Sequence, residues 1–337
     1  MNLKPASDQT VVLTGATSGI GLATALEFAK KGARLVLVAR DDGELAAVEE
    51  RVRDAGAADV LSVAADVADR GGVEYVAQQA TERFGWFDTW INDAGVSVYG
   101  EMKDVPEEDA RQVFETNYWG VVHGSLVAAE AWRSRESERA ACLINVGSIL
   151  SDRAIPLQGH YSASKHAVKG FTDALRMELE KEGVPVSVTL IKPSAINTPY
   201  PQHAGNYMKD ATPTLPQPVY EPEVVARAIV ACAERPTREL TVGAGGRMIS
   251  MMGTLAPRLT DRFMEATQFD AQKRTDRPVR QGPGAVQEPQ ADGNQVHGDV
   301  KGAMAHSLYT QAKLNPGVTF GVALAAGVAL GAALLRR

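Results

Sequence analysis

Short, uniformly apolar stretches alternate along most of the chain with longer stretches that are apolar on one helical face. The uniform stretches cover residues 9–14, 34–39, 60–64, 89–91, 141–146, 186–191 and 239–242. The one-sided stretches cover residues 20–31, 42–55, 73–84, 110–130, 162–181 and 223–234. Strands that are apolar throughout are buried on both faces, and helices of this length connect parallel strands. The alternation therefore predicts an α/β fold, a doubly wound parallel sheet of about seven strands with helices on both faces.

The pattern changes beyond residue 269. Residues 270–316 are rich in Gly, Pro, Gln, Asp and Asn, which predicts a flexible polar linker. Residues 317–335 are uncharged and rich in Ala and Gly, and their length is at the short side of a membrane span. We therefore expect a domain over 1–269 and an apolar C-terminal helix that anchors it to a membrane. A helix packed on the surface of the domain is the alternative.

Composition narrows the class of protein. Hydrophobic residues make up 45% and charged residues 23% of the 337 positions, as in ordinary globular proteins. The net charge of −6 argues against a general nucleic-acid binder. Cys142 and Cys232 lie in apolar surroundings without a C-x-x-C pair, so we expect neither a disulfide framework nor a metal site. Residues 1–10 lack the apolar core of a signal peptide, so we expect a cytoplasmic catalytic domain.

The first predicted strand is followed by the glycine-rich turn TGATSGIG, residues 14–21. A turn of this kind between a strand and a helix is typical of a dinucleotide site. Gly15 permits the tight turn, Gly19 lets the backbone approach the pyrophosphate, and Gly21 lets the helix pack close to the sheet. The helix N-terminus presents free N–H groups to the phosphates. A purely structural turn is the alternative.

The end of the second predicted strand bears on the choice of cofactor. A carboxylate there would bind the adenosine ribose and repel a 2′-phosphate. The chain has Ala39 and Arg40 instead, and a guanidinium can pair with a 2′-phosphate. The sequence therefore favours NADP(H) over NAD(H), unless Asp41 or Asp42 forms an ion pair with the Arg40 guanidinium.

Tyr161 and Lys165 are four residues apart in a predicted helix, so they share one face. A neighbouring ammonium group favours the phenolate and lowers the pKa of a tyrosine, which would make Tyr161 a general acid/base. Ser148 lies upstream, at the end of the fifth apolar stretch.

Together and in this order, these motifs resemble the short-chain dehydrogenase/reductase family, whose single domain has a Rossmann fold. The resemblance covers about residues 8–245 and includes Asn92-Asp93-Ala94-Gly95 and the segment 193–198. It implies a catalytic tetrad of Asn117, Ser148, Tyr161 and Lys165. The cofactor-binding residues that it implies, together with those argued above, are Gly15, Thr17, Ser18, Gly19, Ile20, Gly21, Arg40, Asp66, Val67, Asn92, Ala94, Gly95, Tyr161, Lys165, Pro193, Ser194, Ile196 and Thr198.

The resemblance also implies a reaction, reversible hydride transfer between the nicotinamide and a carbonyl or secondary alcohol. Tyr161 would exchange the proton, Ser148 would hold the reacting oxygen, Lys165 would bind the nicotinamide ribose, and Asn117 would hold a water. Two positions depart from the family pattern: Asp93 replaces an asparagine and Ser194 a glycine. Both replacements are conservative in size or hydrogen bonding, so we expect activity to survive.

The family places its substrate loop at about residues 198–221. The aromatic and similar residues in and beside this loop, which suit an apolar substrate, are His160, Tyr200, His203, Tyr207, Met208 and Tyr220. Helices 110–130 and 162–181 resemble the family's dimer interface, which implies a homodimer or homotetramer. Two alternative functions remain: a catalytically idle cofactor-binding scaffold or redox sensor, and a membrane-tethered interaction protein.

Overall fold

A computed structural model describes residues 1–134, 139–290, 294–315 and Gly317. Its centre is a seven-stranded sheet in the order β12-β7-β6-β4-β1-β2-β3, in which every neighbouring pair is parallel. The strands are β1 (Thr10–Thr14), β2 (Arg34–Ala39), β3 (Asp59–Ala64), β4 (Thr89–Asn92), β6 (Ala141–Val146), β7 (Val186–Pro193) and β12 (Glu239–Val242). The predicted doubly wound parallel sheet is confirmed.

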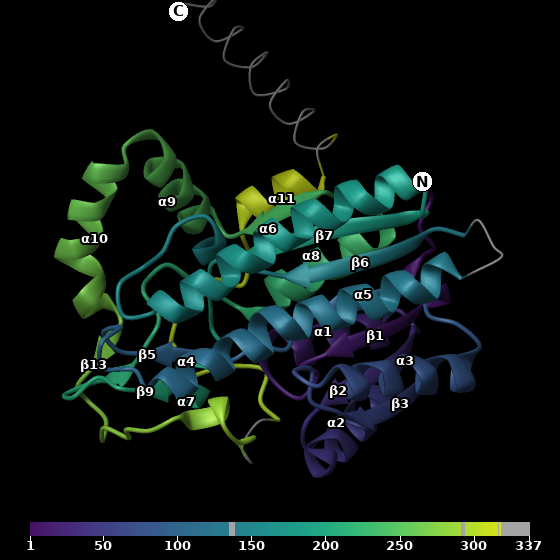
Figure 1. Ribbon diagram of the computed structural model, residues 1–337, viewed down its shortest axis with the longest axis horizontal. Coiled ribbons are helices and arrows are strands. Elements are labelled where there is room, and N and C mark those ends of the chain that lie inside the picture. Colours follow the sequence, from purple (N-terminus) through teal and green to yellow (C-terminus); the bar gives the residue numbers. More distant parts are fainter. Residues whose placement is uncertain (135–138, 291–293, 316, 318–337) are drawn as a thin grey trace, which may run out of the picture.

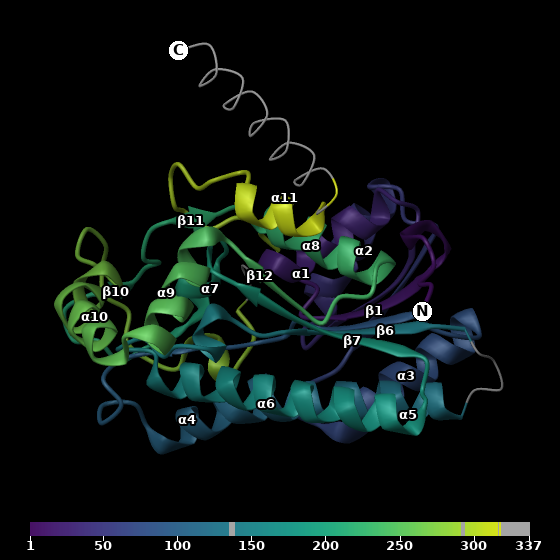
Figure 2. The same ribbon diagram turned by 90° about the horizontal axis from the view of Figure 1, so that it is seen from above.

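Helices cover both faces of the sheet (Figure 2). One face carries α1 (Gly19–Ala29), α2 (Asp42–Asp54) and α8 (Pro222–Glu234), and the other carries α3 (Arg70–Phe84), α4 (Glu107–Phe114), α5 (Gly120–Arg133) and α6 (Gly159–Glu182). Successive strand residues point to opposite faces, so Leu13 packs in the core beneath α1 and Val12 in the core beneath α3. This two-sided burial explains why the strands are apolar throughout.

The helix expected over 110–130 is three elements. A five-residue π-helical turn, Glu115–Trp119, joins α4 to α5. One extra residue in a turn shifts the register of the side chains that follow, and such turns are frequent at functional sites. The hydrophobic pattern does not reveal it, because a single shifted residue leaves the apolar face almost unchanged.

The segment expected as a flexible linker, 270–316, packs on the domain over its described residues. Helix α9 (Ala244–Leu255) precedes it, and α10 (Pro257–Ala271) ends within its first two residues (Figure 1). Its elements are β13 (Lys273–Arg274), the 3-10 turn η4 (Gly284–Val286) and α11 (Leu308–Leu314). The domain supplies hydrogen-bond partners for its backbone: Gly282 N–H donates to Asn206 O at 3.1 Å and Met304 N–H to Val219 O at 2.8 Å. The segment is too polar to build a core of its own, and its hydrogen bonds to the surface of the domain hold it in place.

The apolar helix predicted over 317–335 lies outside the described residues except for Gly317, and it stays a prediction. Within the described ranges, no helix combines the length and apolar character that crossing a bilayer requires.

A buried lysine with two carboxylate partners joins the sheet edge to the segment after β6. Lys192 is 1% exposed, and its Nζ lies 2.5 Å from Asp152 Oδ2 and 2.6 Å from Glu239 Oε1. Lys192→Ala would leave these carboxylates without that partner, so we expect a loss of about 3 kcal/mol in the free energy of unfolding, measured by chemical denaturation at neutral pH.

Lys169→Ala is the matched control, because Lys169 also contacts Asp152 but its side chain is 34% exposed. Removing a partly hydrated partner should cost about 1 kcal/mol or less. Equal losses for the two variants would contradict the prediction that the buried Lys192 contributes more to stability than the partly exposed Lys169.

Candidate functional site

A cavity of about 340 Å³ opens at the carboxyl ends of the strands, where the chain turns from one half of the sheet to the other. Most of the predicted site residues line it. These are Gly15, Thr17, Ser18, Gly19, Ile20, Arg40, Asp66, Val67, Ala94, Gly95, Ser148, Tyr161, Lys165, Pro193, Ser194, Ile196 and Thr198. Ligands of doubly wound sheets bind in this crevice, so the fold and the sequence motifs point to the same place.

The glycine-rich turn is shaped by close contacts that exclude side chains. Gly15 and Gly19 have φ angles of +72° and +51°, which favour glycine. A Cβ atom on Gly21 would lie 2.0 Å from the Gly15 carbonyl oxygen, and one on Gly15 would lie 2.8 Å from the Ala94 nitrogen. These contacts hold the turn tightly against the loop after β4, and the turn lies at the N-terminus of α1, where the pyrophosphate of a dinucleotide would bind.

The other end of the cavity holds Ser148, Tyr161 and Lys165. Ser148 caps a 3-10 turn that follows β6, and its Oγ accepts a hydrogen bond from Leu150 N–H at 3.1 Å. Tyr161 and Lys165 occupy consecutive turns of α6, with Lys165 Nζ 5.7 Å from the centroid of the Tyr161 ring. Lys165 Nζ also donates to Val146 O at 2.9 Å, which fixes the ammonium group behind the tyrosine.

Desolvation dominates the protonation of these groups. It raises the pKa of Tyr161 to about 12, against lowering contributions from hydrogen bonds with Ser148 and Tyr200. It lowers the pKa of Lys165 to about 8, while the nearby Asp93 raises it. The expectation that Lys165 holds the Tyr161 pKa below its usual value is therefore wrong for this structure, because removal of the phenol from water is the largest effect.

Asp93, which departs from the family pattern, is an electrostatic partner of the site. Desolvation raises the pKa of its carboxyl to about 7, and the charge of Lys165 together with a hydrogen bond from Gly21 N–H lowers it. Asp93 thus connects the glycine-rich turn with the end of the cavity that holds Lys165, and its charge favours the protonated form of Lys165.

Three predicted site residues lie behind the cavity wall. Gly21 packs α1 against the turn. Asn92 belongs to a buried hydrogen-bond network, where its Nδ2 donates to Asn145 Oδ1 at 2.8 Å. Asn117 lies in the π-helical turn and bonds to both backbone groups of Val96, at 2.8 Å and 2.9 Å. Asn117 therefore supports the loop that forms the wall, and Asn92 links β4 to β6.

The predicted substrate loop contributes only part of its aromatic residues to the cavity. Tyr200 and His203 line it, with the Tyr200 hydroxyl 2.8 Å from Gln158 Oε1. Met208 and Tyr220 are buried in apolar clusters instead. Tyr207 packs in another such cluster, and His160 does not line the cavity.

Several lining residues escaped the sequence analysis. Gln158 lies just before α6, Ile249 and Met264 come from α9 and α10, and Ala285, Pro289 and Gln290 come from the expected linker. Gln158, one turn before Tyr161 on the same stretch, could have been suspected from its spacing. The others follow no motif, because their position depends on how the C-terminal third folds back.

Comparisons with known proteins agree with this arrangement. The sequence model of the short chain dehydrogenase family matches residues 9–207. An uncharacterized oxidoreductase, YxnA of Bacillus subtilis, is 41% identical over 337 residues, which cover all of this chain and 93% of that protein. An 11-beta-hydroxysteroid dehydrogenase A of Sesamum indicum is 34% identical over 71% of this chain and 70% of its own length.

Solved structures give the same result. A short chain dehydrogenase/reductase from Burkholderia phymatum, in complex with NAD, superimposes with a TM-score of 0.66 and 25% identity over 83% of this chain and 99% of its own. An alcohol dehydrogenase from Thermococcus sibiricus, complexed with 5-hydroxy-NADP, has the same fold with a TM-score of 0.59 and 23% identity over 69% and 95%.

Asp93→Asn tests the electrostatic link to Lys165. The substitution removes the negative charge that raises the Lys165 pKa, so Lys165 should lose its proton at a lower pH than in the wild type, where its pKa is about 8. The alkaline fall of kcat/KM for carbonyl reduction should therefore begin about one pH unit earlier. Profiles measured from about pH 6 to about pH 10 check this. Asp104→Asn, at an exposed position, is the control, and superimposable profiles for all three proteins would refute the link.

Proposed function

Because the chain belongs to the short-chain dehydrogenase/reductase family and is a NAD(P)-dependent oxidoreductase, we propose that it transfers a hydride between NADP(H) and a carbonyl or secondary alcohol, with Tyr161 as the general acid/base. One observation carries the proposal. Ser148, Tyr161 and Lys165 line the same cavity as the glycine-rich turn, so a dinucleotide bound at the turn would extend toward the tyrosine.

The nicotinamide, when bound, supplies or accepts the hydride. In reduction, the Tyr161 hydroxyl donates its proton to the oxygen of the substrate, and a pKa of about 12 keeps this proton in place at neutral pH. The Ser148 hydroxyl holds the same oxygen and provides a fixed dipole where negative charge develops. The Lys165 ammonium stabilises the phenolate that Tyr161 becomes. Asn117 holds the Val96 segment in place and, in the family, positions a water.

The preference for NADP(H) rests on the end of β2. Arg40 lines the cavity there, and its guanidinium suits a 2′-phosphate. The rival partner Asp41 has another role, because its carboxylate caps α2 by accepting from Glu44 N–H at 2.8 Å. One solved relative is in complex with NAD and another protein of the same fold with an NADP derivative, so the preference of this chain depends on its own residues.

An apolar substrate suits the catalytic end of the cavity. Leu150, Ile155, Ile249 and Met264 form much of the wall around Tyr161 and pack in one apolar cluster with it. Relatives named as hydroxysteroid dehydrogenases support a ketone or alcohol on a large apolar skeleton. We propose this class of substrate for the chain.

Assembly and localisation complete the proposal. Helices α5 and α6 lie together on one face of the sheet (Figure 2). Met177 of α6 is 58% exposed, and Trp119 of the π-helical turn is 43% exposed. An isologous interface over these helices would give a homodimer or homotetramer. Association of a cytoplasmic domain with membranes through 317–335 remains part of the proposal.

Tyr161→Phe tests the catalytic assignment. Removing the hydroxyl should lower the turnover of NADPH with apolar ketones and aldehydes by about 10²-fold or more, because no proton donor remains at that position. Binding of NADPH, followed by its fluorescence, should be retained. Tyr75→Phe, at an exposed position, is the control. Near wild-type turnover in Tyr161→Phe would show that another group provides the proton.

Arg40→Asp tests the choice of cofactor. A carboxylate would repel the 2′-phosphate and bind the free ribose hydroxyls, so the ratio of kcat/KM for NADPH to that for NADH should fall below one. Arg70→Asp, at an exposed end of α3, should leave the ratio unchanged. If the wild type uses both cofactors equally well, the assigned role of Arg40 is wrong.

A further inference from the structure

We propose that the C-terminal strap, residues 280–290 and 294–300, forms one wall of the dinucleotide site and controls how fast the cofactor leaves it. The inference rests on the proposed function, because it concerns the same cofactor. The resemblance to the family ends at about residue 245, so the strap is an addition to the fold that family members share. Figure 1 shows the yellow-green stretch running from the foot of α10 past α7 (Tyr200–His203), which contacts the strap at η4.

The strap lines the adenosine end of the cavity. Ala285, Pro289 and Gln290 form part of the same wall as Arg40. Arg40 Nη2 donates a hydrogen bond to the Ala285 carbonyl oxygen at 2.8 Å. A guanidinium has five N–H donors, so this bond orients the group and leaves others for a phosphate. The strap thereby positions the residue on which the NADP(H) preference depends.

The strap also lies against the pyrophosphate end of the turn. Gly19 N–H donates to the Gln295 carbonyl oxygen at 2.9 Å, and Gly298 N–H donates to Asn197 O at 3.0 Å. A Cβ atom on Gly298 would lie 2.4 Å from the Thr198 carbonyl oxygen, so the two backbones are in close contact. Gly19 and Thr198 are close neighbours, because a Cβ on Gly19 would lie 3.1 Å from Thr198 Cβ, and the strap touches both.

Apolar anchors hold the strap on each side of this contact. Val286 is 0% exposed and packs in a cluster with Val96, Val98 and Val113. Val296 is buried in the main core on the α1 face of the sheet. Because both valines point into the domain, the residues next to them are held against the cavity.

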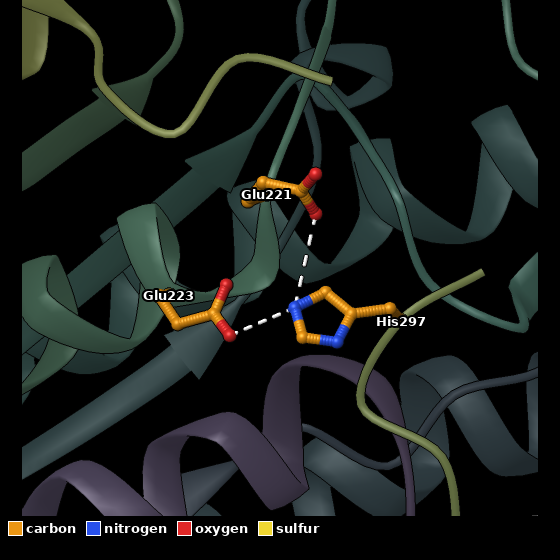
Figure 3. A group of neighbouring side chains, drawn as sticks. All are labelled: Glu221, Glu223 and His297. Carbon is orange, nitrogen blue, oxygen red and sulfur yellow. Dashed lines mark ion pairs between the residues drawn. The ribbon is translucent and has the colours of Figure 1, made fainter. Parts of the chain in front are cut away.

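Charged contacts reinforce the later part of the strap. His297 faces two carboxylates at the start of α8, with its Nε2 2.8 Å from Glu223 Oε1 and 3.9 Å from Glu221 Oε2 (Figure 3). Asp299 pairs with Arg274 at 2.9 Å and Arg277 at 2.5 Å. These contacts tie the strap to both α8 and the segment that follows α10.

A wall of this kind has a kinetic consequence. It buries more of the ligand's surface and orients Arg40 before the cofactor arrives, and both effects slow dissociation more than they change association. The strap should therefore make release of the dinucleotide slow, and it should favour NADPH over NADH because Arg40 is the group that it orients.

Two full-length variants are designed to loosen the strap. Val286→Asp places a charge in the apolar cluster, and Gly298→Ala introduces a Cβ that collides with Thr198 O. We expect the NADPH dissociation rate, measured by stopped-flow fluorescence, and the Kd to rise about tenfold or more, with a smaller change for NADH. Glu288→Ala, an exposed strap position, is the matched control and should behave as the wild type.

The outcomes separate the two claims. A wild type that binds neither NADPH nor NADH would refute the proposed function itself. A wild type that binds, with unchanged dissociation in both variants, would overturn the strap inference alone. Tighter binding in the variants would also overturn it, since the strap would then compete with the cofactor. If Val286→Asp fails to fold, as judged by thermal melting, Gly298→Ala provides the test.

Discussion

The contact between the glycine-rich turn and the loop after β4 is the constraint on which the site depends. Side chains are excluded along this contact: a Cβ on Gly15 would meet Ala94, and one on Gly21 would come within 2.9 Å of Asp93 Oδ2. The same loop continues to Gly95, where a Cβ would lie 3.3 Å from Asn117 Oδ1 and 3.8 Å from Lys165 Nζ. One set of close backbone contacts therefore fixes the position of the glycine-rich turn relative to Lys165.

This closeness also explains the electrostatics. Asp93 and Lys165 lie in the same poorly hydrated space, so the charge of each stabilises the charge of the other. Tyr161 stands at the edge of that space and is kept protonated by its own desolvation. A phenol that holds its proton is suited to donate it to a nascent alkoxide, and the ammonium behind it becomes important only as the proton leaves.

Much of the fold and of the site could be predicted from the sequence, because both depend on local patterns. Uniformly apolar strands indicate two-sided burial, and the spacing of Tyr161 and Lys165 needs only a helical turn. What could not be predicted depends on long-range packing. The π-helical turn around Asn117 and the ordering of the polar segment after α10 arise from surfaces that are far away in sequence.

The hydrogen bond between Gly19 and Gln295 joins two parts of the chain that are made at very different times. The glycine-rich turn leaves the ribosome early, whereas the segment that lies against it follows only after the sheet, α9 and α10 have been synthesised. Contacts between such distant positions form late in folding, because closing so long a loop carries an entropic cost. A nascent chain would thus carry the glycine-rich turn uncovered through most of translation, and a shortened product would fold its sheet without completing this wall.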